Sequence, residues 1–303
     1  IKPAPRMLML TCGALAVGGA AVSDAAHGGV WGFARVLRLE HAALAAQVAD
    51  ISCVASAVAS LTMLAPTVEG EAACSASSRF VSRLRACTAA SSGTMALLAA
   101  GAYAITGGLG GLGLRAAAML VEGGAVGVVL SSRSGRVARI EVERSAVTRV
   151  VPCDVGDAAD TLALLAHRSL TGVLHAAGVL RDKMLRSMSR ADLEVVFAAK
   201  AAAASHIHHA MACTPLKAMG LFSSIASTLG NVGQGNYAAA NAYMDTLVLS
   251  RRHRGSMCSC LQIPAVAGAG MGASTFDKQQ LLSLIHISEP TRRYAISYAV
   301  FCL

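Results

Sequence analysis

The sequence predicts an α/β protein built on a doubly wound parallel sheet, and three features of residues 99 to about 275 carry this prediction. Short apolar runs alternate with helix-length segments, a glycine-rich turn follows the first run, and alanine makes up much of the apolar content. Alternating strands and helices are typical of a parallel sheet with helices on both faces. The chain is 54% hydrophobic and only 14% charged, which is the composition of a folded protein and not of a disordered one.

Six strands are expected in this region, at residues 103–106, 126–130, 149–153, 172–175, 218–223 and 258–263. A glycine-rich turn and a helix that reaches residue 121 follow the first strand. A long helix is expected over about 189–212, and a further helix contains Tyr237.

Residues 1–98 show a weaker version of the same alternation, with strands at 7–11 and 47–51 and a helix at 32–39. They contain no phosphate-binding glycine pattern, so they form either a separate domain or a degenerate copy of the same architecture. Residues 75–93 are rich in Ser, Ala and Arg and are expected to form the linker. We therefore place a domain boundary after residue 98.

The C-terminal residues 279–303 fit no further strand–helix unit and are expected to be a non-native tail. No glycine occurs after Gly272 in a chain that has 29, and residues 283–293 resemble translated sequencing-adapter sequence. The chain begins at Ile1, which indicates a fragment and not a protein that starts with a signal peptide. The catalytic region is accordingly expected to span residues 99–278.

Several other functions are disfavoured by composition and spacing. Residues 94–114 carry no charge and are long enough to cross a bilayer, but their glycines favour a buried strand that runs into a turn. The net charge of +9 has its densest run at 251–254, where no aromatic residue could stack on a base, so we expect no nucleic-acid binding. One helix cannot point the histidines of 206–209 at one ion, so we expect no metal site.

The nine cysteines form no CxxC pair. An odd number of cysteines without a secretory signal favours reduced thiols and a cytoplasmic location.

A dinucleotide site is indicated by the stretch 106–113, Thr-Gly-Gly-Leu-Gly-Gly-Leu-Gly, which lies between a strand and a helix. Glycines permit the tight turn and let backbone N–H groups approach a pyrophosphate at the helix N-terminus. Its candidate residues are Thr106, Gly107, Leu109, Gly110, Gly111 and Gly113.

The end of the second strand indicates which dinucleotide is bound. An acidic residue there would bind the ribose hydroxyls, whereas this chain has Ser132 and Arg133, which favour the 2′-phosphate of NADPH. Asp154 and Val155 follow the third strand and are expected to contact the adenine.

Candidate catalytic residues surround Tyr237. Ser224 directly follows a predicted strand, thirteen residues before Tyr237, and Asn241 follows Tyr237 by four residues, on the same face of a helix. This arrangement resembles the layout of a short-chain dehydrogenase/reductase, except that Asn241 occupies the position where that family usually has a lysine. A phenol of pKa ~10 is a slow proton donor, and a nearby cation lowers its pKa. Lys200 on the preceding helix could supply that cation, although a lysine in an alanine-rich helix is more often solvated.

These motifs resemble the ketoreductase domain of type I polyketide synthases, a family that exchanges the lysine and asparagine positions. The matching stretches are 106–113, HAAGVLRD (175–182), 221–245 and GMGA (270–273). The resemblance implies a Rossmann sheet of the short-chain dehydrogenase/reductase type. It also implies a Lys200, Ser224, Tyr237 and Asn241 tetrad that reduces a β-ketoacyl thioester carried on acyl carrier protein, beside other synthase domains. Ala176, Lys200 and Tyr237 would also contact the cofactor.

The resemblance extends to the N-terminal region. The stretch 28–51 resembles the structural subdomain of the family, a truncated Rossmann-like fold that binds no cofactor. In this family an aspartate at position 182 accompanies one hydroxyl configuration, and a tryptophan at position 229 the other. Asp182 and Leu229 therefore imply the B-type, which gives a (3R)-hydroxyl, unless Asp182 is an ordinary loop carboxylate.

Two departures from the family affect cofactor and lid packing. Only seventeen residues separate Gly135 from Cys153, and the stretch 262–266 lacks the usual tryptophans. Two alternatives stay open: a fatty-acid synthase ketoreductase, and a catalytically silent scaffold domain. A plastid location would replace the cytoplasm if the chain came from a eukaryotic megasynthase.

Overall fold

The computed structural model describes residues 6–15, 25–51, 69–74, 78–83, 100–136, 148–166, 169–264 and 266. The chain divides into two compact units. The first unit comprises Ile1–Leu84, Arg181–Val196 and Ser223–Ser256, and the second comprises Arg85–Leu180, Phe197–Phe222 and Met257–Leu303. No helix in the described ranges is long and apolar enough to cross a membrane.

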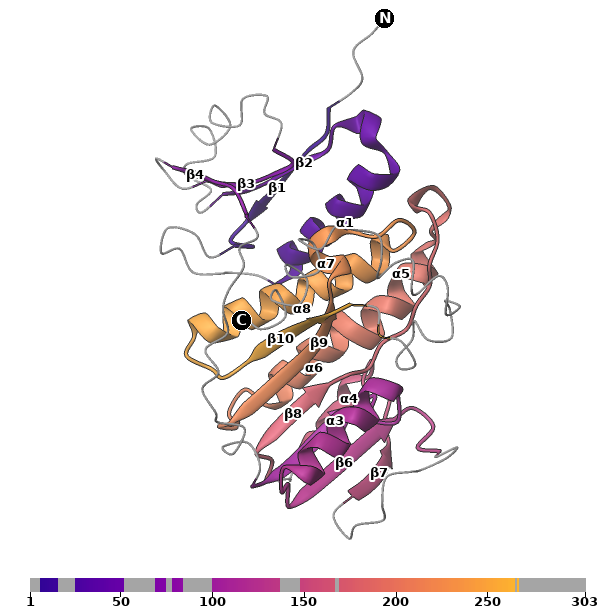
Figure 1. The fold of residues 1–303 in the computed structure, drawn as a ribbon, viewed down its shortest axis with the longest axis vertical. Helices are drawn as coiled ribbons and strands as arrows, with labels where there is room; N and C mark the ends of the chain where they lie inside the picture. Colours follow the sequence, from indigo (N-terminus) through magenta and orange to yellow (C-terminus); the bar gives the residue numbers. More distant parts are fainter. Residues whose placement is uncertain are drawn as a thin grey trace, which may run out of the picture. The chain divides into compact units, whose positions relative to one another are not determined.

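A six-stranded sheet dominates the second unit (Figure 1). Its strands are β5 (Ala102–Thr106), β6 (Gly127–Ser132), β7 (Thr148–Pro152), β8 (Gly172–His175), β9 (Ala218–Ser224) and β10 (Ser259–Ile263). They lie in the order β10-β9-β8-β5-β6-β7, and the pairs from β9 to β7 are parallel. The strand order reverses between β5 and β8. Ligands of open α/β sheets bind at the carboxyl ends of the strands at such a reversal.

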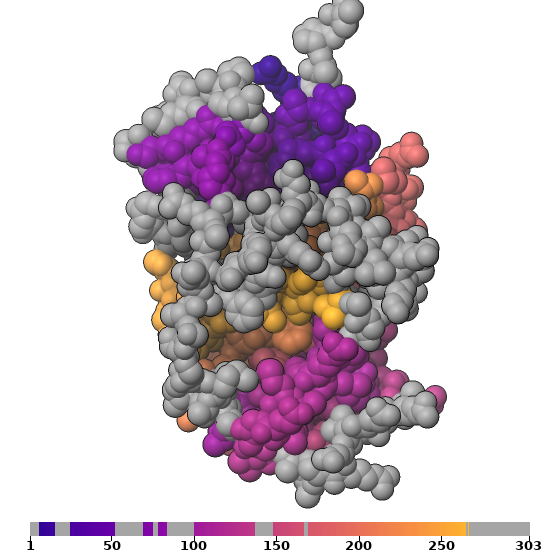
Figure 2. All heavy atoms as spheres, viewed as in Figure 1, coloured from indigo at the N-terminus to yellow at the C-terminus, as the bar shows by residue number. Residues whose placement is uncertain are grey.

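Helices pack on this sheet, because parallel strands are joined by crossover connections that are usually helical. Among the described residues, the α-helices of the second unit are α3 (Gly111–Glu122), α4 (Ala158–Leu165) and α6 (Ala203–Ala210). α3 packs on β5 and β6, while α4 and α6 pack against each other (Figure 1). Tyr103, Ile105 and Leu130 from the strands and Ala117 and Leu120 from α3 form one buried core. The outer side of α3 is open to solvent, and Figure 2 shows residues of this magenta segment at the surface.

The first unit contains a smaller sheet in the order β1-β2-β3-β4. Its strands are β1 (Leu8–Cys12), β2 (Gln47–Ile51), β3 (Glu71–Cys74) and β4 (Arg79–Phe80), of which only β4 is antiparallel to its neighbour. The described helices of this unit are α1 (Ala26–Glu40), the short η1 (Ala42–Leu44) and η4 (Leu185–Ser187), α5 (Arg190–Phe197), α7 (Ala226–Leu229) and α8 (Gly235–His253).

The packing of α1 against α8 depends on two glycines. A Cβ atom on Gly28 would lie 2.1 Å from Oγ1 of Thr246, and one on Gly32 would lie 2.2 Å from the carbonyl oxygen of Ala238. Heavy atoms do not approach so closely, so any side chain at these positions would separate the helices.

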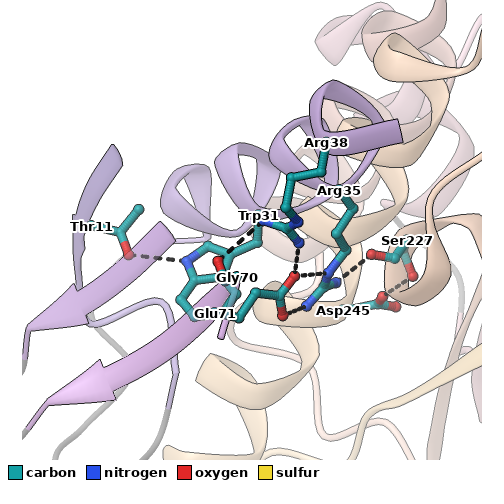
Figure 3. A network of polar contacts seen from close by, with 8 residues as sticks. All are labelled: Thr11, Trp31, Arg35, Arg38, Gly70, Glu71, Ser227 and Asp245. Atoms are coloured by element: carbon teal, nitrogen blue, oxygen red, sulfur yellow. Dashed lines mark hydrogen bonds and ion pairs between the residues drawn. The ribbon is translucent and has the colours of Figure 1, made fainter. Parts of the chain in front are cut away.

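A polar network links α1 to β3 and to α7 (Figure 3). Arg35 donates two hydrogen bonds to the carboxylate of Glu71, each 2.7 Å long, and a third to the carbonyl oxygen of Ser227. Arg38 also pairs with Glu71. Burial alone would raise the pKa of Glu71, but the two guanidinium groups hold it below its usual value. The hydroxyl of Ser227 donates to Asp245 on α8 at 2.6 Å, so α1, β3, α7 and α8 share one network.

The α/β fold class with a parallel sheet is confirmed, and all six strands of the large sheet occur within two residues of their predicted positions. Two predicted helices differ from the structure. The N-terminal helix extends over 26–40, and the helix expected over 189–212 is α5 and α6 joined by a π-helical turn, η5 (Ala198–Ala202). The boundary at residue 98, the stretch 270–273 and the tail 279–303 lie outside the described residues.

Candidate active site

The glycine-rich turn lies at the strand-order reversal, directly after β5. Gly107 has φ +67°, a left-handed conformation that favours glycine, and a Cβ there would lie 2.5 Å from the Cα of Ala177 after β8. A Cβ on Gly113 would lie 2.6 Å from the carbonyl oxygen of Gly107. Gly110 precedes α3 and Gly111 begins it, and both are exposed. This cradle without side chains fits a pyrophosphate held by the N-terminus of α3.

The other candidate cofactor residues of this unit lie near the carboxyl ends of neighbouring strands. Ser132 ends β6 and is followed by the exposed Arg133. Asp154, after β7, is also exposed, and one of its carboxylate oxygens accepts from the backbone N–H of Gly156 at 3.0 Å. Val155 is buried, whereas Ala176 after β8 is half-buried. The exposed and half-buried positions are open to a ligand at this edge, while Val155 offers little surface.

Leu109 and Thr106 contribute to the fold of the turn. Leu109 packs on the core beneath α3. Thr106 is fully buried, and its Oγ1 lies 2.7 Å from Nδ1 of His175.

His175 connects both central strands to the segment that contains Lys200. Its ring is fully buried, and Nε2 lies 3.2 Å from the carbonyl oxygen of Lys200. Burial, together with the positive charge of Lys200, lowers the pKa of His175 to about 3 although its hydrogen bond to the carbonyl acts in the other direction. The imidazole is therefore neutral at physiological pH.

Lys200 lies in the π-helical turn η5 and is only 3% exposed. Its Nζ donates to the carbonyl oxygen of Phe222 on β9 at 3.0 Å. A buried ammonium group requires such acceptors, and π-helical turns are frequent at functional sites.

Ser224, Tyr237 and Asn241 lie together in the first unit, and Lys200 lies in the second. The side-chain amide of Asn241 donates to the carbonyl oxygen of Tyr237 at 2.8 Å, one turn earlier in α8. Burial raises the pKa of Tyr237, hydrogen bonding by Asn241 and Ser224 lowers it, and the charge of Asp182 raises it; the net shift is upward. Without a further cation the phenol is protonated at neutral pH and can donate a proton.

The two candidate stereocontrol residues are also in the first unit. The carboxylate of Asp182 accepts a hydrogen bond from Nε2 of Gln234 at 2.9 Å. Gln234 lies three residues before Tyr237 in the sequence. Leu229 ends α7 and is 48% exposed.

The histidines of 206–209 act as ordinary polar residues. The Nδ1 atoms of His206 and His209 lie 3.3 and 2.7 Å from the backbone carbonyls of Val155 and Ser205. No group of three or more His, Cys, Asp or Glu within the described ranges could hold a metal ion.

Residues 101–268, more than half of the chain, match the family model described as KR domain. The chain belongs to this ketoreductase domain family. Among curated proteins, the chain is 37% identical over 268 residues to a phenolphthiocerol/phthiocerol polyketide synthase protein of Mycobacterium tuberculosis (83% of this chain, 15% of the relative). It is 39% identical over 194 residues to the spectinabilin polyketide synthase system protein NorB of Streptomyces orinoci (60% of this chain, 9% of the relative). The chain thus spans a small part of the length of these relatives.

Solved ketoreductase domains of polyketide synthases share its fold. A structure of A-type ketoreductases from a modular polyketide synthase has a TM-score of 0.82 and 31% identity, and covers 98% of this chain with 66% of its own length. A C2-type ketoreductase also has a TM-score of 0.82, with 28% identity and coverage of 98% and 67%. Because the A-type and C2-type structures have the same TM-score, the fold of the chain does not indicate which ketoreductase type it is. Family and fold together identify a ketoreductase domain of the kind found in polyketide synthases.

Two residues, one in each unit, make contacts that the sequence alone does not indicate. His175 belongs to the stretch 175–182, but its pairing with Thr106 depends on the register of β8 against β5. Glu40 belongs to the stretch 28–51, yet its partners lie about 145 and 193 residues away in the chain. No local pattern indicates contacts of that separation.

Proposed function

We propose that the chain reduces a β-ketoacyl thioester, carried on acyl carrier protein, to the β-hydroxyacyl thioester with NADPH. The observation that carries this proposal is the group around Tyr237, a protonated phenol that Ser224 and Asn241 hydrogen-bond in the first unit. A proton donor held in this way suits a carbonyl oxygen that becomes an alkoxide as it is reduced.

Each residue of the proposed tetrad has a separate task. NADPH supplies the hydride when it is bound. Ser224 donates a hydrogen bond to the substrate carbonyl, and Tyr237 protonates the carbonyl oxygen. Lys200 is assigned to the nicotinamide ribose. Asn241 supports the proton relay, and its buried Oδ1, which has no hydrogen-bond partner among the described residues, is available to accept from a relay water.

The cofactor choice rests on the end of β6. Ser132 and the exposed Arg133 occupy the place where an acidic residue would repel a 2′-phosphate. The pyrophosphate would lie on the glycine turn and the N-terminus of α3, and Asp154, Val155 and Ala176 would contact the adenosine and nicotinamide halves. These residues favour NADPH.

Stereochemistry is assigned to the loop that carries Asp182. With Asp182 present and Leu229 in place of tryptophan, the product is a (3R)-hydroxyl of the B-type. Residues 1–98 serve as a truncated Rossmann-like structural subdomain, and 99–278 as the catalytic region. The remaining residues, 279–303, are a non-native tail.

The test compares Tyr237→Phe with Tyr243→Phe, the same change six residues further along α8. With a β-ketoacyl thioester surrogate, Tyr237→Phe is expected to lose at least about a hundredfold in kcat, the size of one general-acid contribution. Tyr243→Phe is expected to keep the wild-type rate. Retained turnover in Tyr237→Phe would refute the mechanism. A fluorescence titration in which the wild type binds no NADPH would instead favour a silent scaffold.

A further inference from the structure

Glu40 is the last residue of α1, in the N-terminal part of the chain, and its carboxylate binds two distant loops. One oxygen accepts from the backbone N–H of Leu185 at 2.6 Å, and the other accepts from the backbone N–H of Gly233 at 2.8 Å. Hydrogen bonds to a charged acceptor are stronger than those between neutral groups. All three residues are in the first unit, so these contacts are internal to one compact body.

The two loops that Glu40 holds are also joined to each other. The N–H of Lys183 donates to the carbonyl oxygen of Gly233 at 2.8 Å, and Lys183 and Gln234 form an isolated parallel bridge. Gly233 has φ +81°, and a Cβ on Gly235 would lie 2.3 Å from Cδ2 of Leu185. The loops therefore fit together with little freedom, and the carboxylate of Glu40 closes the arrangement at one side.

Each loop leads directly to a residue of the proposed site. The first loop begins with Asp182, whose carboxylate accepts from the side chain of Gln234 at 2.9 Å. The second loop ends where α8 begins, two residues before Tyr237. Asn236 reinforces the junction by donating to the carbonyl oxygen of Arg181 at 2.9 Å. The position of Asp182 relative to the start of α8 is thus set by the hydrogen bonds between the two loops and by those that both loops donate to Glu40.

We propose that Glu40 is a positioning residue for substrate recognition: it fixes the loop that carries Asp182 against the N-terminus of α8 and so controls how the ketone is presented. This inference rests on the proposed function. It assigns a part in selectivity to a side chain from the N-terminal subdomain, which lacks cofactor residues of its own. A 1 Å displacement of a substrate-positioning group is enough to change rates greatly.

The test uses Glu40→Gln, which keeps the size of the side chain but leaves only one oxygen to accept the two N–H groups. The matched control is Glu194→Gln, because Glu194 forms an ion pair with Arg190 one turn away in the same helix, and both side chains are largely exposed. Hydrogen–deuterium exchange of residues 181–188 and 230–236 is measured in the whole chain. We expect exchange about tenfold faster in Glu40→Gln, the change for one lost hydrogen bond, and wild-type exchange in Glu194→Gln.

Turnover of a β-ketoacyl thioester surrogate gives the second measurement. Glu40→Gln is expected to raise KM several-fold and to lower the stereochemical purity of the product, with the Kd for NADPH unchanged. In an Asp182→Ala background the same change is expected to have no further effect on purity, because both act through one loop. Unchanged exchange in the two loops, or faster exchange throughout the chain, would overturn the inference. An inactive wild type would refute the proposed function alone, since the exchange measurement needs no turnover.

Discussion

The Oγ1 atom of Thr106 and the Nδ1 atom of His175 lie 2.7 Å apart at the point where β5 and β8 both end. This contact joins the two central strands at the reversal of strand order. The other ring nitrogen of His175 continues to the carbonyl oxygen of Lys200. The buried imidazole therefore couples the sheet to the π-helical turn that carries the proposed catalytic cation.

The depressed pKa of His175 predicts a specific dependence of stability on pH. Between about pH 6.5 and pH 3 the unfolded chain binds a proton on His175 that the folded chain does not bind, so stability falls as the pH drops through this window. The slope from one such group is at most about 1.4 kcal/mol per pH unit. Urea unfolding of His175→Gln at several pH values should show a flatter dependence than the wild type. His253→Gln, at the exposed end of α8, is the control and should keep the wild-type slope.

Gly32→Ala is expected to lower the free energy of unfolding of the first unit by about 1–3 kcal/mol, the usual cost of overpacking a close contact. The added Cβ would lie 2.2 Å from the backbone of α8, which cannot move aside as a flexible side chain could. The control is Gly127→Ala, whose Cβ would meet only the Cβ of Ala102, at 3.8 Å. Urea midpoints of the two variants measure the difference. Equal midpoints would mean that α1 and α8 are not packed this closely.

Arg133→Glu is expected to shift the cofactor preference toward NADH. The new carboxylate would repel a 2′-phosphate and could bind the ribose hydroxyls, so the ratio of kcat/KM for NADPH to that for NADH should fall at least about tenfold. Arg149→Glu is the matched control, since Arg149 is an exposed arginine near the start of β7 and not at its carboxyl end. A similar change of ratio in both variants would indicate a general effect of charge.

Much of the fold could be predicted from the sequence because local signals carry it. The strands of the large sheet are indicated by apolar runs, the first of which is followed by a glycine-rich turn. The spacing of four residues between Tyr237 and Asn241 predicts that both lie on one face of a helix. The π-helical turn around Lys200 could not be predicted, since an alanine-rich segment continues equally well as an α-helix. The contacts of Glu40 and the pairing of Thr106 with His175 depend on tertiary register, which no short window of sequence contains.

The close packing of α1 on α8 has a consequence for protein engineering. Gly28 and Gly32 leave no room for a Cβ against α8, so the surfaces of the two helices are complementary in shape. About two hundred residues separate α1 from α8 in the sequence. Anyone who exchanges ketoreductases between synthases would therefore have to transplant residues 26–40 together with 235–253. A junction placed between these segments would combine two helix surfaces that do not match in shape. We expect such a hybrid to be too unstable to fold, whatever the state of its catalytic residues.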